Sequence, residues 1–265
     1  TNAIYAQGCC ADRTRGLFAG GDSPATQDID FVTIASLGTY ADSGFNLNGV
    51  QMYNEGLSSA TRGVFAGGFN PGYLNVIDFV TIQSLGNAND FGDLTNQIFG
   101  MAACSNPTRG LYMGGAVSGT ENDPANQKIN IDYITIASTG DAQDFGDLSE
   151  MRAQAGAGSN SIRGIVFGGR YAPTQTIIDF VNIATLGNTS SFGTLSRSET
   201  RDGGAMASST RAAHAGGDNL FPSTVNPVNT IEYVEIATQG NAVDFGDATS
   251  GRNNAACFSN GHGGL

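Results

Sequence analysis

The chain has 265 residues and a formal net charge of −12, with 38 glycines, no tryptophan and 40% apolar residues. Nucleic-acid binding needs clustered basic side chains, whereas this chain has a single lysine, Lys128, and scattered arginines. No apolar run approaches the length of a membrane span. The apolar content also excludes a disordered acidic tail. We therefore expect a folded chain with no nucleic-acid partner and no membrane span.

The first 47 residues predict four short strands. A small, glycine-rich first strand precedes Arg15, and an apolar second strand follows it up to a glycine pair. The third strand is the apolar run that begins at Ile29, and the fourth follows the turn at Gly38. The same order returns in 48–94, 95–148, 149–196 and 197–248. The glycine pairs are Gly20-Gly21, Gly67-Gly68, Gly114-Gly115, Gly168-Gly169 and Gly216-Gly217.

A period of about 50 residues with four strands is typical of a propeller blade. The third strand is apolar on both faces, as expected of a strand covered on both sides by neighbouring blades. The sequence therefore predicts an all-β propeller of about five four-stranded blades, forming one domain over 1–265. Residues 249–265 repeat the start of a unit, because Ser259-Asn260 aligns with Ser105-Asn106. This extra first strand either closes the ring or begins a further blade.

The repeat resembles the kelch repeat, with an arginine, an apolar strand ending in Gly-Gly, an Ile-Asp-Phe/Tyr strand and an aromatic residue before leucine. The kelch tryptophan is replaced by phenylalanine, as at Phe91. The stretch TRGVFAGG…IDFVTI…GNANDFGDL is similar to repeats of virion and tail-fibre-like proteins of marine cyanophages. The resemblance covers essentially the whole chain.

This resemblance implies a non-enzymatic structural or adhesion propeller on the tail, fibre or capsid surface of a virus particle. Its partners would be other virion structural proteins, a host surface that carries glycans, or further copies of itself. The alternative is a secreted, lectin-like propeller without a particle. Propellers host many functions, so the repeat type alone does not choose between them.

The motif Asp-Phe-Gly-Asp carries pairs of carboxylates at equivalent places in three repeats. One interpretation is a calcium site, because hard cations bind clustered carboxylate and carbonyl oxygens. The other is structural, with the carboxylates accepting backbone N–H bonds in a turn. No EF-hand-like run of ligands accompanies them, so we expect no cofactor, with calcium as the alternative. The residues are Asp90, Asp93, Asp144, Asp147, Asp244 and Asp247.

An arginine precedes each second strand, which suggests either a ring of anion-binding groups or a repeated structural contact. The structural interpretation is favoured, because a structural solution recurs wherever the structure recurs. The partner would be a backbone carbonyl or an aspartate of the third strand, such as Asp78 or Asp132. These repeat arginines are Arg15, Arg62, Arg109, Arg163 and Arg211.

The remaining reactive side chains show no enzyme signature. His214 and His262 have neither the order of a catalytic triad nor a metal-binding spacing. Cys10, Cys104 and Cys257 fall in first strands, either as small buried residues or with a disulfide from Cys9 or Cys10 to Cys257. We expect a protein that is not an enzyme.

The loops between the second and third strands vary most between repeats. In an up-and-down blade these loops emerge on one face, and insertions gathered on one face of a propeller commonly mark its binding side. Aromatic side chains there could stack on sugars or fill a partner surface, or they could pack within their own loops. The candidate binding residues are Phe69, Tyr73, Tyr171 and Phe221.

Overall fold

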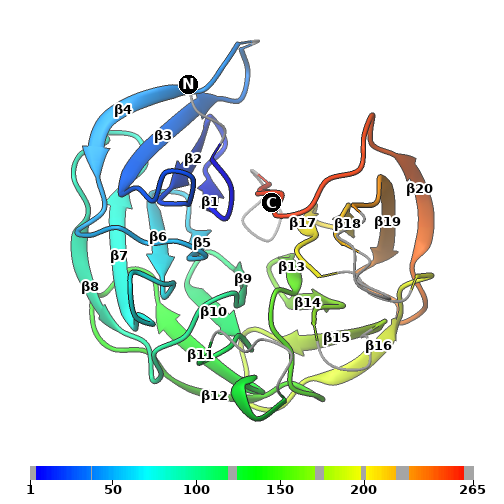
Figure 1. Cartoon of the computed structure of the whole chain (residues 1–265). Coiled ribbons are helices and arrows are strands. Elements are labelled where there is room, and N and C mark those ends of the chain that lie inside the picture. The colour runs from blue at the N-terminus through cyan, green and yellow to red at the C-terminus, as the bar shows by residue number, and fades with distance from the viewer. Residues whose placement is uncertain are drawn as a thin grey trace.

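The computed structural model describes residues 4–36, 38–118, 124–170, 176–197, 201–218 and 227–259. Five four-stranded antiparallel sheets stand around one axis (Figure 1). The chain is thus a five-bladed β-propeller, and the sequence-based prediction of blade number and strand number is confirmed. One 3-10 helix, η1 (Pro124–Asn126), lies in the described part of the chain. No helix in that part is long and apolar enough to cross a membrane.

Each blade is built from four consecutive strands, numbered in chain order from the axis outward. Blades one and two are β1 (Gly8–Ala11), β2 (Arg15–Ala19), β3 (Asp28–Thr33), β4 (Ala41–Asn46), β5 (Glu55–Ser58), β6 (Arg62–Ala66), β7 (Val76–Thr81) and β8 (Asn89–Asp93). Blades three to five are β9 (Ala102–Ser105), β10 (Arg109–Met113), β11 (Asn130–Thr135), β12 (Gln143–Asp147), β13 (Gly156–Ser159), β14 (Arg163–Phe167), β15 (Ile177–Asn182), β16 (Ser190–Thr194), β17 (Gly204–Ala207), β18 (Arg211–Ala215), β19 (Thr230–Glu235) and β20 (Val243–Asp247).

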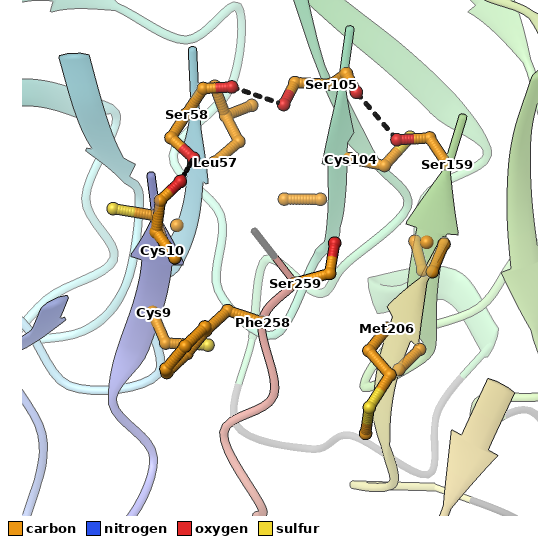
Figure 2. A pocket seen from close by; sticks show the side chains of 17 residues that line it. Cys9, Cys10, Leu57, Ser58, Cys104, Ser105, Ser159, Met206, Phe258 and Ser259 are labelled. Atoms are coloured by element: carbon orange, nitrogen blue, oxygen red, sulfur yellow. Dashed lines mark hydrogen bonds between the residues drawn. The ribbon is translucent and has the colours of Figure 1, made fainter. Parts of the chain in front are cut away.

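Serine side chains link the innermost strands to one another. The hydroxyl of Ser58 donates to the carbonyl of Ala11, that of Ser105 to Ser58, and that of Ser159 to Ser105, at 2.7–2.8 Å. Figure 2 shows this chain of hydrogen bonds running from blade to blade around the axis. The small residues predicted for the first strands therefore have two roles, because they fit where the blades converge and they join neighbouring blades.

The core lies between blades rather than within one blade. Phe91, on β8 of blade two, is 2% exposed and belongs to one apolar cluster with Ile134 and Ile136 of blade three. The equivalent Phe145 packs with Val181 and Ile183 of blade four. Each blade thus completes its core only when the next blade covers it.

The glycine pairs are required by close approach of backbone. Gly67 and Gly68 have φ values of 66° and 108°, which disfavour any side chain. A Cβ atom on Gly68 would stand 2.6 Å from the carbonyl oxygen of Met52. With no side chain in the way, the N–H of Gly68 donates to the carbonyl of Ile98, in the segment that enters blade three, at 2.8 Å.

The Asp-Phe-Gly-Asp motif forms a β-bulge in the fourth strand. Asp78 pairs with Asp90 and Ile77 with Gly92, so Phe91 is the extra residue and turns into the junction with blade three. The carboxylate of Asp90 accepts the N–H of Gly92 at 3.2 Å. In blade five, Asp244 accepts from Gly246 at 3.0 Å. In these two blades the first aspartate of the motif thus accepts a backbone N–H bond, as the structural interpretation predicts.

The chain beyond β20 returns to the axis between blade five and blade one (Figure 1). Gly204 of β17 packs against Cys257, and Gly16 of β2 packs against the ring of Phe258. β1 keeps its place in blade one, so the two first strands do not compete for one position. The extra strand expected in 249–265 is not formed within 249–259, the part of this range that the structure describes. A first strand is held by hydrogen bonds to a second strand beside it, and within 249–259 the chain has no such partner strand.

Candidate binding groove and loop face

A groove of about 710 Å³ lies on blade two, between the connection from blade one and a turn of blade three. Its polar walls are formed by Asn48, Asn70, Asn89, Asp90, Asp93 and Asp141. Apolar side chains, including Val50, Leu74 and Val76, line the remainder. Its volume falls within the range of small-molecule sites, which combine apolar walls with a few fixed polar groups.

A buried network around Asp78 holds one wall of the groove in place. The carboxylate of Asp78 accepts hydrogen bonds from the backbone N–H and side-chain amide of Asn48, and from the amide of Gln51 at 2.9 Å. Burial raises the pKa of Asp78, although these hydrogen bonds oppose the shift. The network therefore fixes the connecting segment 48–51 against β7.

Five aromatic rings form a continuous row on the face where the loop of blade two emerges. The Tyr73 ring stacks on Phe99 with centroids 5.4 Å apart, and Phe69 lies 5.4 Å from Tyr73. Tyr53 continues the row at 6.1 Å from Phe99, and Tyr5 follows at 6.4 Å. Phe99 is buried, whereas the other four rings are partly or largely exposed.

Two of the four predicted binding aromatics, Phe69 and Tyr73, therefore lie together in this aromatic row. The two rings pack on each other and remain half-buried, and their role in binding stays a prediction. Tyr171 and Phe221 lie outside the described residues. The sequence did not single out Tyr5, Tyr53 or Phe99, because these residues belong to the segments that enter blades rather than to the variable loops.

The predicted calcium ligands separate into different places. Asp90 and Asp93 line the groove together with Asp141. The remaining candidates Asp144, Asp147, Asp244 and Asp247 lie at the equivalent bulges of blades three and five. Across the described residues, no group of three or more His, Cys, Asp or Glu side chains is arranged to hold a metal ion. Calcium binding stays a prediction.

Four of the five repeat arginines, Arg15, Arg62, Arg109 and Arg163, bind backbone carbonyls of the next blade, and Arg211 pairs with Glu235 instead. Arg62 donates to the carbonyl of Ile136 at 2.9 Å, and its guanidinium lies 4.5 Å from the centroid of the Phe79 ring. Asp78, expected as a partner of such an arginine, is instead bound by the loop that precedes its blade. The aspartate pairing was therefore wrong, because the third-strand aspartates face the preceding blade and the arginines face the following one.

The axis itself has little free space. The cavity at one mouth has a volume of about 70 Å³, which suits a few water molecules rather than an organic ligand. Glu55 lines this cavity, and burial, aided by the charge of Asp202, raises its pKa to about 8.

All four cysteines are free, so the structure has no disulfide from Cys9 or Cys10 to Cys257. The Cys9 thiol instead donates a hydrogen bond to the carbonyl oxygen of Cys257 at 2.9 Å.

Comparison of the chain with protein-family models gives no match, and comparison with curated proteins gives none either. The resemblance to kelch repeats and to cyanophage virion proteins therefore stays a prediction. The geometry of the groove and of the aromatic row has to support any functional conclusion independently.

Proposed function

We propose that this chain is a non-enzymatic adhesion propeller that binds a glycan-bearing surface through the groove on blade two and the adjacent aromatic row. The observation that supports this most is the combination of exposed amides and carboxylates with apolar walls in one groove of ligand size. Amide groups both donate and accept hydrogen bonds, and carboxylates accept them, which matches the hydroxyl groups of a sugar. Leu74 connects the two features, because it lines the groove and directly follows Tyr73.

The resemblance of the repeats supports a position on a virus particle, where such a module would attach to a host surface or to another virion protein. The alternative is a secreted lectin-like propeller with the same groove. The two differ in location rather than in binding chemistry. Fractionation of the native source on a density gradient separates them, because a virion component migrates with particles at a fixed copy number.

The binding chemistry is tested on a glycan array. The expected result is selective binding of a small set of glycans, with affinity reduced by about tenfold or more in the variant Asn70→Ala/Asn89→Ala, because each lost hydrogen bond contributes about 0.5–1.5 kcal/mol. Ser84→Ala, an exposed change on the third-to-fourth-strand turn of blade two, is the matched control. Absence of binding to any glycan, or equal binding by the double variant, contradicts the proposal.

A further inference from the structure

Every blade has two different faces. In blades one to four the leading face packs on the next blade along the chain, and in blades two to five the trailing face packs on the preceding one. The leading face of blade five includes Phe245, because its equivalent Phe91 packs on blade three. The trailing face of blade one includes Phe18, Ile34 and Tyr40, because their equivalents Phe65, Ile82 and Ala88 pack on the preceding blade. These two faces border the position to which the chain returns after β20 (Figure 1).

Both faces expose apolar side chains that are buried elsewhere in the ring. Phe245 is 63% exposed, whereas its equivalents Phe91, Phe145 and Phe192 are at most 4% exposed. Ile34 is 38% exposed, whereas its equivalents Ile82, Ile136, Ile183 and Ile236 are at most 1% exposed. Because the repeats are alike in sequence at these positions, the difference comes from a missing neighbour on each side.

The polar contacts of a blade junction are also missing there. Arg163 donates to the carbonyl of Ile236 in blade five, but the equivalent Arg211 turns to Glu235 of its own blade. In other junctions, the residue two positions after a fourth strand donates to the third-strand carboxylate of the next blade, as Thr95 does to Asp132. In the described residues, the nearly buried Asp30 of blade one has no such donor.

The axis already holds the beginning of a sixth unit. The residue two positions before each first strand has a left-handed backbone, and the series is Ala6, Tyr53, Gly100, Gln154, Asp202 and Asn254. All six line the same axial cavity. In addition, Gly217 donates to the carbonyl of Arg252 at 2.8 Å, just as Gly115 donates to Arg152. Residues 252–258 thus occupy the position of a sixth entry segment and first strand.

We infer that the space between blades five and one receives the second, third and fourth strands of a sixth repeat of this kind, carried on the same polypeptide as residues 255–258. Only a sheet with this repeat pattern offers, together, an isoleucine to cover Phe245, a carbonyl for Arg211 and a hydroxyl or amide for Asp30. We favour a sixth repeat on the same polypeptide, because a first and a second strand need only a short turn between them. In blade three, residues 106–108 are enough to join these two strands.

The test compares the present chain with an extended one. Alignment of Ser259 with Ser105 places Leu265 opposite Leu111, so a copy of residues 112–148 is joined directly after Leu265. In the present chain, Phe245→Ala lowers the Tm by less than about 1 °C, because the side chain is exposed. In the extended chain the same change lowers it by about 8 °C, as expected for a Phe→Ala change in a core.

The matched control is an extended chain in which the isoleucines copied from Ile134 and Ile136 are replaced by aspartate, and here Phe245→Ala again has little effect. An equal effect of Phe245→Ala in the present and extended chains overturns the proposal. So does a dimer of the present chain, seen by sedimentation and abolished by Phe245→Asp, because a second copy is then the occupant. The inference concerns ring closure and does not depend on the glycan groove. A result that contradicts the sixth repeat therefore does not contradict glycan binding, and the reverse also holds.

Discussion

The guanidinium of Arg109, on β10 of blade three, donates a hydrogen bond of 2.7 Å to the carbonyl oxygen of Ile183 at the end of the third strand of blade four. The same guanidinium lies 4.7 Å from the centroid of the Tyr133 ring of its own blade. One side chain therefore contacts an aromatic ring in its own blade and the backbone of the next. This contact recurs in Arg15, Arg62 and Arg163.

Replacement of Arg109 by alanine is expected to destabilise the propeller by about 1–3 kcal/mol, through loss of a charge-assisted hydrogen bond and a cation–π contact. Chemical denaturation followed by intrinsic fluorescence measures the change. Arg211→Ala is the matched control, because Arg211 pairs with the exposed Glu235 instead of a neighbouring blade. Equal decreases in the free energy of unfolding of the two variants would show that the Arg109 contact between blades does not stabilise the propeller.

Alanine at Gly68 is expected to destabilise the fold by about 1–3 kcal/mol, because φ is 108° there and a Cβ atom would lie 2.6 Å from the Met52 carbonyl oxygen. Alanine at Gly72, in the same loop, meets no atom within 4 Å and serves as the control. Thermal unfolding of both variants measures the difference. A Gly68→Ala variant as stable as Gly72→Ala contradicts the close-approach explanation.

Glu55 makes the stability fall as the pH rises. Burial raises its pKa from 4.5 to about 8, so the folded chain keeps a proton that the unfolded chain releases. Its contribution is fully present below pH 4.5 and declines up to about pH 8. In Glu55→Gln this decline is absent, so the Tm of the variant changes less between pH 5 and 8 than that of the parent protein. Parallel pH profiles of the two proteins would exclude the effect.

His214 makes the stability fall as the pH falls, the opposite of the effect of Glu55. It is 2% exposed beside Phe167, and burial lowers its pKa from 6.5 to about 4. The unfolded chain therefore binds a proton that the folded chain does not, and stability declines as the pH falls from 6.5 to about 4. His214→Phe, which installs the residue found at the equivalent Phe65, is expected to remove this acid-side decline. Thermal unfolding scans from pH 4 to 7 provide the measurement.

The blades could be predicted from the sequence because each blade needs the same residue types at the same positions. Apolar third strands, glycine pairs and the anchoring Phe91 all recur at fixed spacing, and each was placed correctly. The sequence left the partner of the repeat arginines open between a backbone carbonyl and an aspartate, because no residue type in the sequence identifies which backbone carbonyl of another blade lies nearby. The opposite exposures of Phe91 and Phe245 were equally hidden, because the two residues share a motif and differ only in their neighbours.

The groove could be predicted only in part for the same reason. Asp90 and Asp93 were singled out from their motif, and the loop that contains Asn70 and Leu74 was singled out from its variability. Asn48 and Asp141 were not, because they reach the groove from the connection between blades one and two and from a turn of blade three. Repeat alignment finds equivalent positions, whereas a groove brings together positions that are not equivalent.

Glycan binding at the groove is tested most directly by hydrogen–deuterium exchange of the protein with and without the glycan that the array selects. The account predicts slower exchange in 48–51, 70–76 and 89–93, with little change in blades four and five. Slower exchange confined to another blade, or no change at any site while glycan is bound, would contradict it.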